Sequence, residues 1–252
     1  VFTQQDHFGT AFALSRHGEE VCLTGGSADG RLTSYRQRAN FGASDQGVSF
    51  VRYVSSDGQE HFVAGSEPTP GSPNAAPLVG PVVINEIMYN PADTGQEYLE
   101  LHNITSQPVR LYDPAHPDHT WAIDGGVRFS FPTGSELPAG GYALVAGTDP
   151  AAFRGEYGIP PEVAVYGPYD GRLDNAGEAV GLYKPGEVEA GSGEWSYVRV
   201  DAVEYDDRSP WAQLPDGHGP SLERIAPNLF ADDPANWYAS EGAGSPGAAS
   251  SG

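Results

Sequence analysis

Short runs of alternating apolar and polar residues, separated by glycine and proline, recur along most of this 252-residue chain. Gly (33) and Pro (22) together exceed a fifth of the residues. The runs between them have a period of two and are rich in β-branched and aromatic residues, as half-buried antiparallel strands are. The clearest are Val82–Met88, Tyr98–His102, Tyr142–Ala146 and Val198–Tyr205. The sequence therefore predicts an all-β fold, and the regular turn signals favour a β-sandwich.

One segment departs from the strand pattern, and it is predicted to form a short helix. In Asp149–Tyr157, Asp149 suits an N-cap and Pro150 suits the first helical position. The apolar positions of the strands should form the core, with two tryptophans closing the ends of the sandwich. The residues that we expect to be buried are Val83, Ile84, Ile87, Leu99, Leu101, Leu144, Val180, Leu182, Trp211, Leu222 and Trp237.

The charge of the chain excludes some classes of partner. The formal net charge is −21, from 34 acidic and 13 basic residues, and such a surface repels nucleic acid and anionic lipid. No apolar run approaches the ~20 residues of a membrane helix, so no membrane insertion is expected. The lone cysteine, Cys22, cannot form an internal disulfide, and its apolar strand context predicts a small core residue.

An internal repeat divides the chain. LSRHGEEVCL (Leu14–Leu23) returns as LDNAGEAVGL (Leu173–Leu182), with Leu, Gly-Glu, Val and Leu at the same spacings. Three further landmarks follow each copy in the same order: Gly47–Tyr53 and Gly219–Ile225, His61-Phe62 and Asn236-Trp237, and Pro70-Gly71 and Ser245-Pro246-Gly247. Four matched landmarks in one order indicate a true repeat.

The two copies are of unequal length. Residues Pro81–Tyr169 have no counterpart before Leu14. We therefore expect residues 1–78 to be the C-terminal half of a β domain and residues 79–252 to be a complete one. A half sandwich exposes a strand edge and an apolar face. We expect other protein subunits, or an upstream part of the same polypeptide, to cover them.

The front of the complete copy carries a family resemblance. VVINEIMYNPADTGQEYLELHN (Val82–Asn103) resembles the opening of a bacterial lamin tail domain, and later landmarks agree in order. The resemblance implies an immunoglobulin-like β-sandwich without catalytic residues, in modules of secreted or cell-surface proteins. The Gly- and Glu-rich segment Lys184–Ser196 departs from the family, and we expect it to be an exposed hairpin tip.

Two acidic groups raise the question of a cation. Ca²⁺ takes carboxylate and carbonyl oxygens from loops at strand ends, and neither group matches a helix–loop–helix calcium loop. The alternative is that these residues, with Glu100, are outward polar positions, Glu86 pairing locally. The candidate Ca²⁺ ligands are Glu86, Asn90, Asp93 and Glu97 in the first group, and Asp201, Asp206 and Asp207, next to Glu204, in the second.

No catalytic motif accompanies these features. His116 and His119 suggest zinc, but Pro117 prevents a helix and no thiol lies nearby in sequence, so a solvent-facing loop is expected. The leading hypothesis is a non-enzymatic structural or adhesive module of an extracellular or cell-surface protein, as a protomer of a fibre or other ordered assembly. The alternative is a substrate-binding accessory module of a larger secreted hydrolase or kinase.

Overall fold

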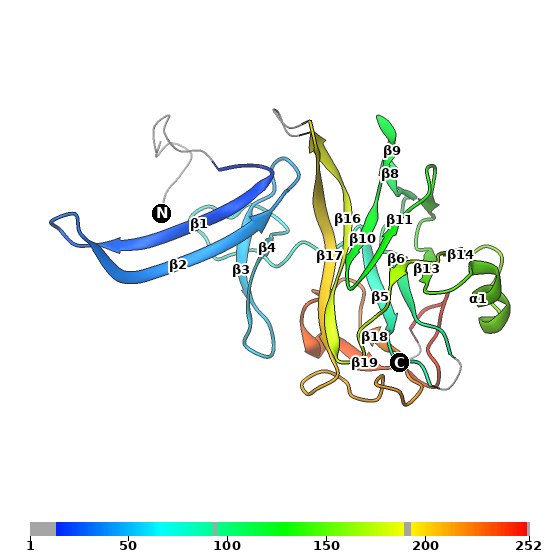
Figure 1. Ribbon diagram of the computed structural model, residues 1–252. Coiled ribbons are helices and arrows are strands. Elements are labelled where there is room, and N and C mark those ends of the chain that lie inside the picture. Colours follow the sequence, from blue (N-terminus) through cyan, green and yellow to red (C-terminus); the bar gives the residue numbers. More distant parts are fainter. Residues whose placement is uncertain (1–13, 93–94, 189–192, 251–252) are drawn as a thin grey trace. The chain divides into compact units, whose positions relative to one another are not determined.

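The computed structural model describes residues 14–92, 95–188 and 193–250 of the chain (Figure 1). The chain divides into two compact units. Unit 1 comprises Val1–Val54, Glu60–Leu78 and Gly186–Val198, and unit 2 comprises Ser55–Gln59, Val79–Pro185 and Arg199–Gly252. No helix in the described residues is long and apolar enough to cross a membrane.

Unit 2 is built on two β-sheets that pack face to face, as in an immunoglobulin-like sandwich. The five-stranded sheet has the order β15 (Asp170–Gly171), β11 (Val127–Ser130), β10 (Ala122–Gly125), β16 (Gly177–Val188), β17 (Trp195–Asp206). The six-stranded sheet has the order β14 (Ala164–Tyr166), β13 (Tyr142–Ala146), β6 (Tyr98–Asn103), β5 (Val82–Met88), β18 (Leu222–Arg224), β19 (Trp237–Ala239). The strand pattern of the sequence therefore predicts this all-β fold correctly.

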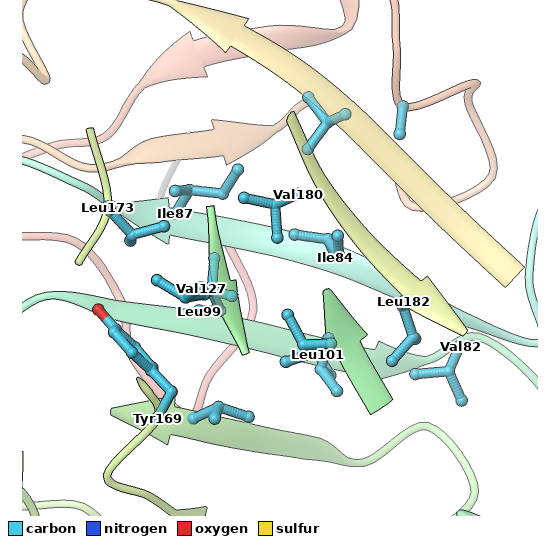
Figure 2. Packing of buried hydrophobic residues seen from close by; sticks show 14 of the residues in the cluster. Val82, Ile84, Ile87, Leu99, Leu101, Val127, Tyr169, Leu173, Val180 and Leu182 are labelled. Carbon is cyan, nitrogen blue, oxygen red and sulfur yellow. The ribbon is translucent and has the colours of Figure 1, made fainter. Parts of the chain in front are cut away.

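The main core lies between the two sheets. Figure 2 shows Val82, Ile84 and Ile87 of β5 against Val180 and Leu182 of β16. All eleven residues that the sequence predicts to be buried are buried. Ten of them lie in strands whose faces water cannot reach, and Trp211 lies in the turn after β17. The core thus follows directly from the period-two pattern.

The other face of the six-stranded sheet is also buried. Helix α1 (Pro150–Tyr157) packs Phe153 into a second apolar cluster with Met88, Tyr98 and Leu144. The predicted helix is confirmed: Asp149 caps it by accepting hydrogen bonds from the amides of Ala151 and Ala152, and a proline stands in its first turn. Both faces of this sheet are therefore interior, which explains why β5 is buried at every residue.

Unit 1 contains two antiparallel hairpins. The first pairs β1 (Gly18–Gly26) with β2 (Leu32–Gly42), and the second pairs β3 (Phe50–Val54) with β4 (Glu60–Ala64). Three aromatic rings join them: the centroid of Phe50 lies 5.2 Å from that of Phe41 and 5.7 Å from that of Phe62. In the described part of the chain, β1 and β3 pair with no strand other than these hairpin partners.

Two short sheets complete unit 2: β7 (Val109–Arg110) with β12 (Glu136–Leu137), and β8 (Tyr112–Asp113) with β9 (His116–Thr120). The expected loop at His116–His119 is wrong, because these residues form most of β9, although they are largely exposed. The expected hairpin tip at Lys184–Ser196 includes the ends of β16 and β17, and its residues 189–192 lie outside the described residues.

Candidate functional site

A row of three buried glutamates crosses the six-stranded sheet. Glu86 of β5 stands opposite Glu100 of β6 on one side and Glu223 of β18 on the other. None of the three is exposed to solvent. The alternative that Glu86 and Glu100 are outward polar residues is therefore wrong, because helix α1 and the C-terminal segment cover the face from which alternation would let them reach water.

The C-terminal segment closes over this row of carboxyl groups. The amide of Ser245 donates to Glu86 Oε1 at 3.2 Å, and the amide of Gly247 donates to Glu100 Oε2 at 2.6 Å. The hydroxyl of Ser245 donates to Glu223 Oε1 at 2.8 Å. Hydroxyl groups of Tyr98 and Ser221 reach Glu86 Oε1, each at 2.5 Å. The network fastens the end of the chain to the sheet.

Burial changes the protonation of these groups. It raises the pKa of Glu86 to about 7, although the hydrogen bonds from Ser221 and Tyr98 oppose the rise. It raises the pKa of Glu100 to about 9, with the charge of Glu86 as the next contribution. Glu86 Oε2 has no hydrogen-bond partner, so no hydrogen bond offsets the burial of this oxygen. The row is a structural network that no substrate can reach.

A buried ion pair connects the two sheets. The Arg224 Nη2 atom of β18 lies 2.9 Å from Asp201 Oδ2 of β17, and both side chains are buried. The same Asp201 oxygen accepts the amide of Ile84 at 2.8 Å. Burial raises the pKa of Asp201 even though Arg224 opposes the rise. Both of its oxygens are occupied by this contact, so Asp201 holds the sandwich together.

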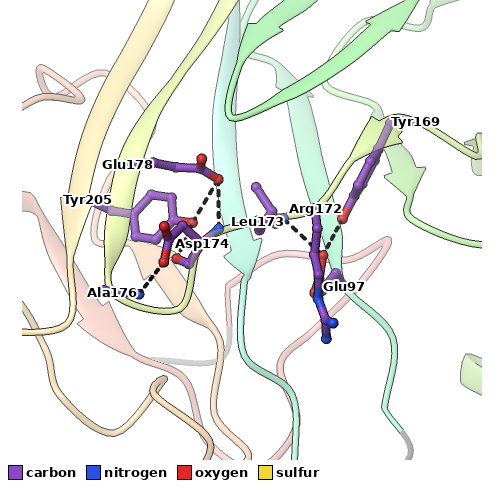
Figure 3. A network of polar contacts seen from close by, with 8 residues as sticks. All are labelled: Glu97, Tyr169, Arg172, Leu173, Asp174, Ala176, Glu178 and Tyr205. Carbon is purple, nitrogen blue, oxygen red and sulfur yellow. Dashed lines mark hydrogen bonds and ion pairs between the residues drawn. The ribbon is translucent and has the colours of Figure 1, made fainter.

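A third network surrounds the turn before β16 (Figure 3). Glu97 accepts hydrogen bonds from the Tyr169 hydroxyl at 3.1 Å, the Leu173 amide at 3.0 Å and Arg172 Nε at 2.8 Å. Glu178 in turn accepts from the amide of Asp174 at 2.9 Å. These contacts fix the Leu173–Gly177 turn against the segment that leads into β6.

The proposed calcium ligands are engaged in separate contacts. Among the described residues, no group of three or more His, Cys, Asp or Glu side chains is arranged to hold a metal ion. The calcium site stays a prediction without support from this part of the chain. The contacts of Glu86, Glu97 and Asp201 are described above. Asn90 donates to Asp216, Asp206 accepts from the Arg208 amide, and Asp207 lies 3.6 Å from Arg208 Nε. Asp93 lies outside the described residues.

The contacts of His116 and His119 described here lie within the β8–β9 hairpin. His116 Nδ1 lies 3.0 Å from Asp113 Oδ2, and the ring centroids of His116 and His119 are 6.2 Å apart. This contact lowers the pKa of the Asp113 carboxyl. The arrangement is an exposed hairpin contact, and no third metal ligand joins it in the described residues.

The turns that contain Gly18 and Gly177 have the same geometry. The Ser15 amide donates to Glu19 at 2.7 Å, as the Asp174 amide donates to Glu178 at 2.9 Å. A glycine precedes each glutamate, with a φ of +97° at Gly18 and +106° at Gly177. The Gly18 amide donates to the carbonyl of Ser15 at 3.4 Å, and the Gly177 amide donates to the carbonyl of Asp174 at 3.2 Å. The two segments thus agree in structure at the spacings where they agree in sequence.

The later landmarks agree in register. Phe50 pairs with Ala64 and Arg52 with Phe62, as Leu222 pairs with Ala239 and Arg224 with Trp237. The amide after each hairpin donates back to a serine carbonyl: Gly65 to Ser49 at 2.8 Å and Ser240 to Ser221 at 2.9 Å. The proline–glycine turns also share a bond, Ser72 to Thr69 and Ala248 to Ser245, at 3.1 and 3.0 Å.

The two copies differ in how much of their apolar surface is covered. Leu23 is 61 % exposed and Leu14 59 % exposed, whereas Leu182 and Leu173, at the matching positions, are 0 % and 2 % exposed. A groove of about 640 Å³ lies between the two hairpins of unit 1, lined by Val21, Leu23, Ala39 and Phe62 among others.

Cys22 lies in the same groove and is exposed. The expectation that it is a core residue is therefore wrong. The strand has the apolar pattern of a core strand, but no second layer covers it, because β1 pairs only with β2 in the described residues. The sequence signal was correct for the strand and misleading for its surroundings.

Comparison with known proteins adds one finding. A family model described as Lamin Tail Domain matches residues 75–206, which include the strands from β5 to β17. Neither the curated proteins nor the solved structures give a match to the chain.

Proposed function

The chain belongs to the lamin tail domain family, a family of non-enzymatic immunoglobulin-like domains, and on this premise we propose that it is a structural or adhesive module. We place it in an extracellular or cell-surface protein, where it serves as a protomer of a fibre or another ordered assembly. The residues before β5 act as the C-terminal half of a second lamin tail domain, which needs protein surface from elsewhere to complete it.

One observation carries this proposal: apolar residues that are buried in unit 2 are exposed at the matching positions of unit 1. Leu23 is 61 % exposed and Leu182 is 0 % exposed, although their strands share a sequence pattern. Exposed apolar surface of this kind marks an interaction site more often than it is tolerated in an isolated monomer. The chain therefore has the surface properties of an assembly component.

The ionisable groups of unit 2 support a non-catalytic role. The groups with the largest changes in pKa, such as Glu86 and Glu100, are buried and bonded to neighbouring side chains and amides. A catalytic acid or base has to reach its substrate, and these carboxyl groups have no exposed surface. Their altered protonation follows from their place in the fold.

The groove of unit 1 also favours a second candidate function. Arg38, Asn40 and His61 line it beside Phe62, and polar groups next to an aromatic ring can hold a polymer. An accessory module that binds polymer substrate for a secreted hydrolase or kinase would use such a surface. Binding of soluble polysaccharides or peptidoglycan fragments to the purified chain, lost on Phe62→Ala, would favour this function.

Location and assembly state test the main proposal. Intact cells of the source organism are treated with protease, and native extracts are separated by size with an antibody against unit 2. We expect the protein to be cleaved on intact cells or found in the medium, in a species larger than the 26.6 kDa of the chain. A protected, monomeric protein inside the cell would contradict the proposal, as would substrate turnover abolished by one substitution.

A further inference from the structure

We propose that unit 1 binds the front half of a lamin tail domain that lies outside residues 1–252, and that this half adds a strand beside β3 and covers the apolar side chains of β1. This inference rests on the proposed function as an interaction module, and it names the partner. The partner is defined by chemistry: two adjacent antiparallel strands with apolar residues on one face and one glutamate in each strand on the other. Strand addition of this kind uses main-chain hydrogen bonds for affinity and side-chain pockets for specificity.

Unit 2 provides the template for this arrangement. There β16, the counterpart of β1, pairs with β10, and Ile123 stands opposite Leu182. There also β18, the counterpart of β3, pairs with β5, and Ile87 stands opposite Leu222. In the described residues, neither β1 nor β3 has such a second neighbour. The site beside β3 that corresponds to the place of β5 beside β18 is thus the site that we assign to the first strand of the partner.

The apolar face of the partner follows from the same comparison. Figure 2 shows Val82 of β5 beside Leu182, and Ile84 and Ile87 near Val180. In unit 1 the matching residues, Leu23 and Val21, line the groove. A strand with the apolar spacing of β5 would cover both, because side chains two residues apart lie on one face of a strand.

A buried hydroxyl group in unit 1 points to the glutamate. The Oγ atom of Ser49 is buried without a hydrogen-bond partner. Ser221, at the matching position of unit 2, donates its hydroxyl to Glu86 of β5 at 2.5 Å. Because a buried unpaired hydroxyl costs free energy, Ser49 is poised for a carboxyl group on the incoming first strand.

The proline–glycine turn of unit 1 offers a place for the second glutamate. The Thr69–Gly71 turn and the Ser245–Gly247 turn each contain an equivalent backbone hydrogen bond. The φ angle is +77° at Gly71 and +87° at Gly247. In unit 2 the Gly247 amide donates to Glu100 of β6. In unit 1 this turn is largely exposed, so its amides are available to a glutamate on the incoming second strand.

The strands come from outside these 252 residues, because the matching strands of unit 2 are already in use. Its β5, β6 and β10 are buried in unit 2. A second copy could donate them only by opening its own sandwich, which would expose as much apolar surface as the contact covers. We therefore commit to an unused front half that lies outside residues 1–252.

The probe is a synthetic peptide with the sequence of residues 81–103 of this chain, which holds both strands and both glutamates. It is labelled with a fluorophore and titrated with the full-length chain. We expect saturable binding, and we expect the protein variant Leu23→Asp to weaken it at least tenfold. Leu32→Asp is the matched control, because Leu32 is 71 % exposed on the same hairpin and does not line the groove. It should bind like the unaltered chain.

A double-mutant cycle tests the proposed hydrogen bond. The protein variant Ser49→Ala and the peptide variant Glu86→Leu should each weaken binding by roughly tenfold, because each removes one partner of the proposed hydrogen bond. Together they should weaken it no more than either one alone. Additive effects would show that the two groups do not meet and would overturn the assignment of the glutamate.

Three results would overturn the proposal as a whole. The first is no binding at millimolar peptide. The second is equal binding to the Leu23→Asp variant, which would place the peptide elsewhere. The third is self-association of the chain that Leu23→Asp abolishes, which would make a second copy the occupant. None of these results depends on where the protein is found in the cell, so this test and the test of location fail independently.

Discussion

Arg224 and Arg52 stand at matching positions of the two units and have opposite surroundings. Arg224 is buried beside Asp201 and lies over the ring of Trp237 at 5.4 Å. Arg52 is half exposed and pairs with Glu60 on the neighbouring strand. Removing one partner of a buried pair leaves a charge without compensation, whereas an exposed pair contributes little.

We therefore expect Arg224→Met to lower the free energy of unfolding by about 3–5 kcal/mol. Arg52→Met is the matched control and should leave it unchanged. Urea unfolding of the two variants, followed by tryptophan fluorescence, measures both effects. Equal and small effects would mean that the Asp201–Arg224 pair does not hold the two sheets together.

The glutamate row makes the stability of unit 2 depend on pH. Glu86 has its pKa raised to about 7 and Glu100 to about 9, while both carboxyl groups titrate near 4.3 in the unfolded chain. Below that pH both states are protonated and the full stability is present. As pH rises, the unfolded state loses its protons first, so the free energy of unfolding falls, by at most ~1.4 kcal/mol per pH unit for each group.

Substitution of Glu86 by Gln tests this dependence. Glutamine has the shape of the neutral carboxyl group and keeps an acceptor at Oε1, where three donors converge. We expect Glu86→Gln to reduce the loss of stability between pH 4.5 and pH 7, measured by thermal unfolding. Glu162→Gln, at an exposed site, is the control and should follow the unaltered chain. A steep loss that persists in Glu86→Gln would contradict this assignment.

At the scale of elements, the turn before β16 depends on one glycine. Gly177 has a φ of +106°, and a Cβ atom there would lie 2.5 Å from the carbonyl oxygen of Tyr205. A side chain would strain the turn and push the neighbouring strand backbone away. We expect Gly177→Ala to lower the free energy of unfolding by about 2 kcal/mol or more in urea.

Gly155 supplies the control for this experiment. It lies in helix α1, where an added Cβ atom meets nothing within 4 Å. Gly155→Ala should raise the free energy of unfolding by ~0.5–1 kcal/mol, because alanine favours a helix over glycine. If both substitutions changed the free energy of unfolding in the same direction, the conformation of the turn would not be the reason that position 177 requires glycine.

The strands could be predicted from the sequence, and the burial of their polar residues could not. Period two predicts β5, β6 and β13 at nearly their observed bounds, because alternation reflects the geometry of the strand itself. Alternation also predicts that one face of the sheet is exposed to solvent. This prediction is wrong for Glu86 and Glu100, which are buried. Their covering comes from α1 and the C-terminal turn, elements far away in sequence. The available signal was Glu100 between Leu99 and Leu101 in the middle of a strand.

At the scale of the whole molecule, the repeat in the sequence predicts matched local geometry but not matched burial. The Leu14–Leu23 segment forms the same turn as its counterpart and begins the β1–β2 hairpin of unit 1. The burial of that hairpin depends on what packs against it, which its own sequence does not specify. For this reason the exposure of Cys22 and Leu23 could not be predicted from their strand.

Amide hydrogen exchange on the full-length chain tests most directly the claim that unit 1 is an uncompleted half sandwich. A two-stranded hairpin with an uncovered face is marginally stable in water, so its amides should open far more often than those of a covered strand. We predict that the β1 amides exchange on the order of 100-fold faster than the matched amides of β16 when the chain is alone. Equal protection of β1 and β16 in a monodisperse 26.6 kDa monomer would contradict the claim.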